Sequence, residues 1–232
     1  MREIVLDTET TGFDPNKGDR IVEVGCVELM NHLPTGRELH IYINPERDVP
    51  LEAQKVHGLT DEFLADKPVF ADIADDIIAF LEDSPLIAHN ATFDMRFLNA
   101  EFEKVGRPRL DSARVIDTLK IAQAKFPGAP ANLDALCRRF NVDASAREKH
   151  GALIDSYLLA EVYLELIGGR APGLDFGQGQ TRGAGRGATV AIERPFREPR
   201  PHAPSPAEDE AHRAFLAQNG SSWLWYGGEK TG

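Results

Sequence analysis

The chain has 232 residues, which suits one domain of ordinary size and a further segment. Its formal net charge of −11 argues against autonomous binding to duplex nucleic acid, because phosphate binding usually needs a basic surface. Two cysteines are too few for a disulfide framework and favour a reducing, cytoplasmic setting. Because the sequence shows no apolar leader and no apolar stretch of spanning length, we expect neither secretion nor membrane insertion.

Strand-like runs open the chain, and helices then alternate with strands. The first three runs cover residues 3–9, 20–30 and 37–44, close enough in sequence for an antiparallel meander. After them we expect a helix at about 69–82, a strand at 86–88, a helix that begins at Asp94, a strand around 113–117, and helices near 118–125, 132–140 and 152–167. This order predicts an α/β fold with a mixed five-stranded sheet and helices on both faces.

Four carboxylates and one histidine stand at the ends of these elements. Asp7 and Glu9 are two residues apart at the end of the first strand, so their side chains share one face. Asp94 and Asp155 each begin a helix in register with its apolar, core-facing stripe. His150 is rotated by roughly 140° from Asp155 at about 3.6 residues per turn, so we expect it on the preceding loop.

Taken singly, each of these acids is typical of a helix first turn or of a solvated turn. Their order, spacing and shared register favour convergence on one spot. Converging acids repel one another unless a cation lies between them, and hard divalent cations prefer oxygen ligands. The pattern therefore predicts a magnesium or manganese site with a histidine nearby that can act as a base.

Composition changes abruptly at Gly168. The segment from there to Pro206 holds eight glycines and six prolines without apolar periodicity, which predicts a linker. Ser205 and Glu208 form a capping box with Pro206 at the first helical position, which predicts a short helix to Gln218. We expect a domain at 1–169, a linker at 170–204 and a partner-binding segment at 205–232.

An aromatic cluster follows that helix, at Trp223, Leu224 and Trp225. It has no core of its own, so it either anchors a partner protein or packs back on the domain. We favour the anchor.

Three blocks of the sequence resemble the DEDDh exonucleases, which have the RNase H-like fold. The blocks are LDTETTG at 6–12, HNATFD at 89–94 and HGALID at 150–155, supported by 56–64, 115–119 and 132–137. Within that family the resemblance is closest to the proofreading (epsilon) subunits of bacterial DNA polymerase III. It covers roughly residues 3–169 and, more loosely, the C-terminal tail.

The resemblance implies 3′→5′ hydrolysis of single-stranded DNA ends with two Mg²⁺ (or Mn²⁺) ions. Asp7 would bridge both ions, with Glu9 and Asp155 on one and Asp94 on the other, and His150 would be the base. The residues expected to contact the substrate are Asp7, Glu9, Thr10, Glu52, His57 and Asp155, with Gly12 letting the backbone approach the 3′ end. Without the resemblance, Glu52 reads as an exposed helix acid and His57 as a loop histidine that caps backbone groups.

The resemblance also implies partners for the tail. The segment with Trp223, Leu224 and Trp225 would bind the alpha-like catalytic subunit of DNA polymerase III. Residues 171–176 look like a sliding-clamp-binding peptide, in which Leu174 and Phe176 would enter an apolar groove. Alanine stands where glutamine is usual, so we expect only weak clamp binding. With so acidic a chain, we infer local DNA binding and processivity supplied by a partner.

Two other readings of the sequence remain open. A free-standing exonuclease of the same fold would act on short RNA or on tRNA ends, but it would need no linker followed by an aromatic anchor. A non-catalytic, polymerase-associated scaffold would be expected to lack a metal ligand, whereas all five positions are filled.

Overall fold

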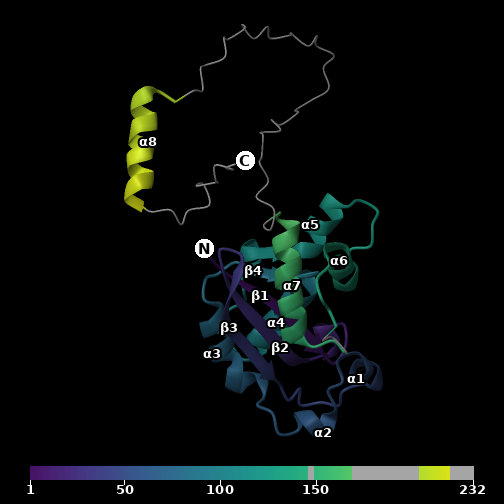
Figure 1. The fold of residues 1–232 in the computed structure, drawn as a ribbon. Helices are drawn as coiled ribbons and strands as arrows, with labels where there is room; N and C mark the ends of the chain where they lie inside the picture. Colours follow the sequence, from purple (N-terminus) through teal and green to yellow (C-terminus); the bar gives the residue numbers. More distant parts are fainter. Residues whose placement is uncertain (146–148, 169–203, 220–232) are drawn as a thin grey trace, which may run out of the picture. The chain divides into compact units, whose positions relative to one another are not determined.

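The computed structural model describes residues 1–145, 149–168 and 204–219. The chain divides into two units, Met1–Gly177 and Gln178–Gly232, and each is described by itself. Within the described residues the first unit contains the sheet and helices α1 to α7, and the second contains helix α8 (Figure 1).

The sheet of the first unit has five strands in the order β3-β2-β1-β4-β5. The strands are β1 (Arg2–Thr10), β2 (Ile21–Met30), β3 (Leu33–Tyr42), β4 (Leu86–Ala88) and β5 (Val115–Asp117). The first three form the antiparallel meander that the sequence predicted, while β4 is parallel to β1 and β5 is parallel to β4. The mixed five-stranded sheet is thereby confirmed.

Seven α-helices surround this sheet in the described part of the first unit. They are α1 (Leu51–His57), α2 (Asp61–Leu64), α3 (Phe70–Leu81), α4 (Thr92–Lys104), α5 (Thr118–Lys125), α6 (Leu133–Phe140) and α7 (Ala152–Leu166), with 3₁₀ turns η1 (Pro15–Lys17) and η2 (Ser112–Arg114). Helix α4 begins two residues before the predicted start, so Asp94 lies within its first turn. The prediction omitted α1 and α2. The first begins after Pro50 without a side-chain cap, and the second has four residues.

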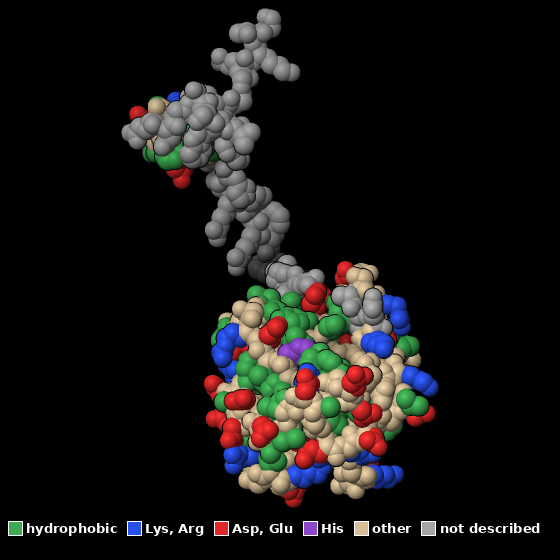
Figure 2. All heavy atoms as spheres, turned by 90° about the horizontal axis from the view of Figure 1, so that it is seen from below, with side chains coloured by type: hydrophobic (Ala, Val, Ile, Leu, Met, Phe, Trp, Pro, Cys, Tyr) green, Lys and Arg blue, Asp and Glu red, His purple; other side chains and the backbone are tan. Residues whose placement is uncertain are grey.

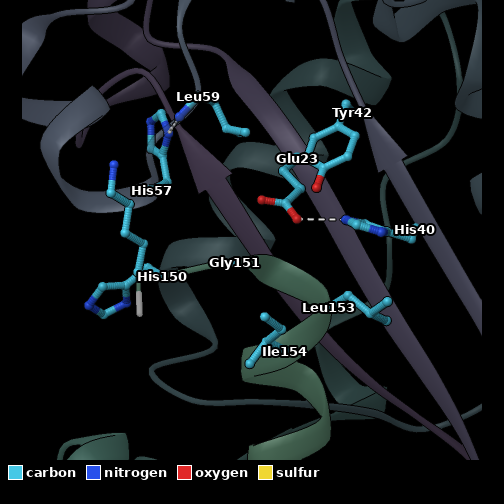
Figure 3. Close-up of a pocket in the computed structure, with 10 residues that line it drawn as sticks. Glu23, His40, Tyr42, His57, Leu59, His150, Gly151, Leu153 and Ile154 are labelled. Atoms are coloured by element: carbon cyan, nitrogen blue, oxygen red, sulfur yellow. Dashed lines mark hydrogen bonds and ion pairs between the residues drawn. The ribbon is translucent and has the colours of Figure 1, made fainter. Parts of the chain in front are cut away.

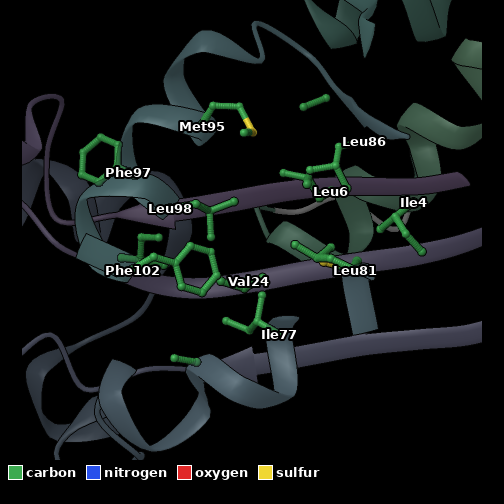
Figure 4. Close-up of a cluster of buried hydrophobic side chains, with 14 of the residues drawn as sticks. Ile4, Leu6, Val24, Ile77, Leu81, Leu86, Met95, Phe97, Leu98 and Phe102 are labelled. Carbon is green, nitrogen blue, oxygen red and sulfur yellow. The ribbon is translucent and has the colours of Figure 1, made fainter. Parts of the chain in front are cut away.

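Strand β1 is buried on both faces over its apolar run. Ile4 and Leu6 pack against α3 and α4 in the main core (Figure 4), and Val5 packs on the opposite face against α7. Because side chains alternate along a strand, Asp7 and Glu9 continue the α7 face and Thr8 continues the α4 face. The end of β1 can therefore be reached by acids from both layers of helices.

Helix α8 (Pro206–Asn219) is the described element of the second unit. The Ser205 backbone N–H donates to Glu208 Oε2 at 2.7 Å, and the Glu208 N–H donates to Ser205 Oγ at 3.3 Å, which confirms the predicted capping box. The predicted partner contacts lie outside the described residues: Leu174, Phe176, Trp223, Leu224 and Trp225. Among the described helices, none combines the length and apolar character needed to span a membrane.

Candidate active site

A glycine in β2 lets helix α7 approach the end of β1. Gly25 pairs with Asp7 in the β1–β2 ladder, and a Cβ atom on it would lie 2.3 Å from the backbone of Ala152. The Ser156 hydroxyl donates to the Gly25 carbonyl oxygen at 3.0 Å. The first turn of α7 is thus held directly over the strand pair, which places Asp155 beside the acids of β1.

Glu9, His150 and Asp155 form the tightest cluster at this site. One ligand atom from each lies within 4.8 Å of the others. His150 Nδ1 lies 3.3 Å from Asp155 Oδ2, with the imidazole half exposed and the carboxylate buried. His150 precedes α7 on a loop, as predicted, and its backbone N–H donates to the Val56 carbonyl at 3.2 Å.

Asp94 approaches from α4, on the other face of the sheet. It is 2 % exposed, and Oδ1 accepts a hydrogen bond from the Thr8 hydroxyl at 2.7 Å. Burial raises the pKa of Asp94 from 3.8 to about 7, although the Thr8 hydrogen bond acts in the opposite direction. The role of Thr8 was missed, because alternation along β1 placed it away from Asp7 and Glu9.

Asp7 lies among these groups, and its pKa responds to the charges of the other three acids. Its pKa is raised well above the usual range, first by burial and then by the charges of Asp94, Glu9 and Asp155. All four predicted acids therefore act on one another at the end of β1. Carboxylate oxygens in mutual repulsion, with one imidazole beside them, form a donor set that fits divalent cations.

A groove of about 590 Å³ opens beside this cluster. Five of the residues predicted for the site line it: Glu9, Thr10, Gly12, Glu52 and His57. Phe13 and Phe93 add aromatic surface to its walls. Glu52 is exposed in the first turn of α1. The groove joins the acid cluster to a partly apolar surface that can accept a base and a sugar.

His57 ends α1 and is 6 % exposed. Its Nδ1 accepts the Leu59 backbone N–H at 3.0 Å, so it does cap a backbone group, while Nε2 makes no hydrogen bond of regular geometry within the described residues. Burial lowers the pKa of His57, opposed in part by Glu23 and the Thr10 backbone. The ring is therefore held neutral, with Nδ1 as the acceptor of the Leu59 N–H and Nε2 buried near the Thr10 backbone.

A second hollow, of about 350 Å³, is lined by His57 and His150 among other residues (Figure 3). Glu23 lines it, is 3 % exposed, and lies 2.7 Å from His40 Nε2. It pairs with Glu9 across the β1–β2 ladder, and its charge contributes to the raised pKa of Asp7. Sequence reasoning missed Glu23, although the register of the meander would have placed it opposite Glu9.

The RNase T family model, described as an exonuclease, matches residues 4–163. The chain is 58 % identical over 173 residues to the DNA polymerase III subunit epsilon of Rickettsia conorii, covering 73 % of this chain and 75 % of that one. It is 41 % identical over 235 residues to the subunit epsilon of Escherichia coli K12, covering 97 % of each.

Solved structures share the fold. The nuclease domain of 3′hExo, a DEDDh family member bound to rAMP, superposes with a TM-score of 0.61 at 19 % identity, covering 72 % of this chain and 91 % of that one. Exonuclease X in complex with 5′ overhanging duplex DNA superposes with a TM-score of 0.56 at 25 % identity, covering 71 % of this chain and 90 % of that one.

Proposed function

Because this chain belongs to the RNase T exonuclease family and is a proofreading 3′–5′ exonuclease, we propose that it removes 3′-terminal nucleotides at the carboxyl end of β1. The observation that carries this proposal is the cluster of Glu9, His150 and Asp155 within 4.8 Å, beside Asp7 with its raised pKa. Strong perturbation by burial and neighbouring charge, next to a groove, is typical of a catalytic centre.

Two Mg²⁺ or Mn²⁺ ions are the proposed cofactors. Asp7 would contribute to both, Glu9 and Asp155 to one, and Asp94 to the other. When bound, the ions stabilise charge on the attacking and leaving oxygens of an in-line displacement. The acids support this assignment because the charges of Asp94, Glu9 and Asp155 raise the pKa of the buried Asp7, and bound cations would offset that repulsion.

His150 is the proposed base. Its Nδ1 faces Asp155 Oδ2 at 3.3 Å, so a proton held at Nδ1 leaves Nε2 as the acceptor. Nε2 would take the proton of the attacking water, and the half-exposed imidazole could then release it to solvent. Asp155 would orient the ring in addition to its role toward the ions.

The terminal nucleotide is proposed to occupy the 590 Å³ groove. Thr10 and Gly12 would present backbone to the 3′ end, with the Thr10 hydroxyl held by the Gly12 carbonyl at 2.5 Å. Glu52 and the side chain of His57, which line the groove, would contact the sugar and its 3′ hydroxyl. Acidic and neutral groups suit a hydroxyl end better than a charged phosphate end.

The tail is the proposed attachment to the replicative machinery in the cytoplasm. Trp223, Leu224 and Trp225 would anchor the alpha-like catalytic subunit, and Leu174 and Phe176 would bind a sliding clamp weakly. The relatives named as subunits of DNA polymerase III support this reading. A tethered enzyme needs little DNA affinity of its own, which agrees with the acidic chain.

A 5′-labelled primer on a template tests the proposal. With Mg²⁺, we expect shortening from the 3′ end, faster on a 3′-mispaired primer than on a paired one because a frayed end enters the groove more readily. Asp155→Ala should abolish it. Faster digestion of a matched RNA would favour the free-standing RNA exonuclease instead, and no digestion would favour the scaffold.

A further inference from the structure

We propose that Arg96, Arg109 and Lys120 bind phosphates of the substrate strand upstream of the scissile bond, in a third depression, the basic hollow. This inference rests on the proposed exonuclease function. It adds a path for the strand after it leaves the groove of the terminal nucleotide.

The basic hollow has a volume of about 230 Å³ and lies at the first turn of α4. Thr92 and Met95 of that turn line it together with the three cations, and Asp117 is the carboxylate among its lining residues. Asp94 is two residues from Arg96, which is about 3 Å along the axis and roughly 200° around it. Asp94 therefore faces inward to the acid cluster while Arg96 faces outward to the basic hollow.

Arg96 also connects the basic hollow to the groove. Its Nη2 lies 2.9 Å from Asp14 Oδ1, and Asp14 lines the groove of the terminal nucleotide. The two depressions thus meet at one ion pair beside the first turn of α4. A strand that crosses this turn passes from the acid cluster directly to the cations.

The other two cations have only weak partners. Arg109 Nη1 lies 3.4 Å from the exposed Glu103, and Lys120 Nζ lies 3.9 Å from Asp117 Oδ2. The side chains of Arg109 and Lys120 are 67 % and 75 % exposed. Exposed ion pairs at such distances contribute little to stability, so a substrate phosphate can replace the carboxylate as the partner of each cation.

Asp117 offsets one of these three charges, and its carboxylate is held in place by the backbone. Oδ1 accepts the N–H of Leu119 at 3.0 Å, capping α5, and the N–H of Asn90 at 3.2 Å. Two backbone donors hold this carboxylate at the rim. It fixes the connection between β4 and α4 and leaves the cations facing outward.

The surroundings of the groove are unfavourable for phosphates. The chain carries −11, and the face in Figure 2 shows acidic side chains scattered across the first unit among Lys and Arg side chains. The groove itself is lined by Glu9, Asp14, Asp19 and Glu52 against Lys17. Phosphates beyond the scissile bond are therefore expected to move toward the basic hollow, whose lining has three cations and one carboxylate; the acids paired with Arg96 and Arg109 lie outside the lining.

Two substrates separate strand binding from chemistry. The first is a single-stranded oligodeoxynucleotide of about six residues, and the second is the 4-nitrophenyl ester of thymidine 5′-monophosphate, which has no upstream strand. The full chain is compared with Arg109→Gln/Lys120→Gln, which leaves the Arg96–Asp14 pair intact, and with the matched control Lys104→Gln near the far end of α4.

Each phosphate contact to a single strand contributes about 0.7 to the slope of log affinity against log salt, or about fivefold at 0.1 M salt. The double variant should therefore raise the KM for the oligonucleotide by up to about 25-fold and lower the salt slope by about 1.4. Its kcat on the oligonucleotide, its rate on the ester and the behaviour of Lys104→Gln should match the wild type.

An unchanged oligonucleotide KM or salt slope would overturn the inference. So would an equal loss on the ester, because it would mean that the variant disturbs the catalytic groove. If the wild type hydrolyses neither substrate, the exonuclease assignment itself fails, which is a distinct result.

Discussion

Gly25 and Ala152 approach so closely that a single methyl group on the glycine would lie 2.3 Å from the Ala152 backbone. Real Cβ atoms essentially never come this near to backbone, so α7 would have to move. Gly25 pairs with Asp7 and α7 carries Asp155, so the contact sets the separation of the acids on the α7 face of the sheet. The geometry of the site thus depends on a residue with no side chain.

Gly25→Ala should therefore lose at least tenfold in kcat, since displacements of about 1 Å at a reacting centre can cost about 10²-fold. Overpacking should also lower the free energy of unfolding by about 1–3 kcal/mol. Steady-state rates and urea unfolding measure the two effects.

Gly151→Ala is the matched control at the same end of α7. Gly151 has an extended φ of −153°, and a Cβ there would meet only Ile154 Cδ1 at 4.0 Å. Wild-type activity in Gly25→Ala would show that the close approach of α7 to β2 does not determine the separation of the acids.

Asp94 makes the stability of the metal-free protein depend on pH. Its folded pKa of about 7 exceeds the ordinary value of 3.8, so the folded state binds this proton more tightly. The resulting stabilisation is complete below about pH 4 and is lost as the pH rises through about 7, and the raised pKa of Asp7 acts in the same direction. In a chelator, the urea midpoint should therefore fall across this range.

Asp94→Asn should flatten that dependence and be more stable than the wild type at pH 8, because the amide oxygen can still accept the Thr8 hydroxyl. Asp75→Asn is the control, since Arg107 lowers the pKa of that exposed carboxyl. A wild-type midpoint that rises steadily from pH 4 to 8 in chelator, with the same rise in Asp94→Asn, would contradict the assignment of a raised pKa.

His150→Gln should lower turnover by about 10²–10⁴-fold, the usual contribution of a positioned base. Mn²⁺ affinity should change little, because His150 is proposed to move a proton and not to hold an ion. The decrease in turnover as the pH falls should also become shallower in this variant. A variant that keeps that loss with unchanged steepness would show that another group titrates.

Removal of residues 171–232 should leave hydrolysis of free single-stranded DNA intact and abolish co-purification with the polymerase catalytic subunit. Trp223→Ala/Trp225→Ala should reproduce that loss, because buried aromatics dominate interface energies. Leu174→Ala/Phe176→Ala is the control and should affect only clamp binding. Tight polymerase binding by the truncated chain would place the anchor in the first unit.

The sequence predicted the sheet and most helices because their apolar periodicities are strong. The strand-like run at residues 3–9 and the capping box of Ser205 and Glu208 are local signals, and they correspond to the observed elements. Helix α1 carries Glu52 and His57 but has no cap and is seven residues long, so local pattern could not reveal it.

The sequence predicted the acids and the histidine of the candidate site, but it did not predict the residues that position them. Thr8, Glu23 and Gly25 act through contacts with α4, β3 and α7, which depend on sheet register and helix packing. Register between β1 and β2 could have indicated Glu23 from the sequence. The close approach at Gly25 follows only from the three-dimensional packing.

We propose that the acids at the end of β1 hold two divalent ions that carry the hydrolysis. A Mn²⁺ titration of the full chain tests this proposal, with thymidine 5′-monophosphate present and free Mn²⁺ followed by electron paramagnetic resonance. We expect two ions per chain in the wild type, one in Asp94→Asn, and neither bound tightly in Asp7→Asn, with hydrolysis lost in both variants. Two tightly bound ions and undiminished hydrolysis in Asp7→Asn would contradict it.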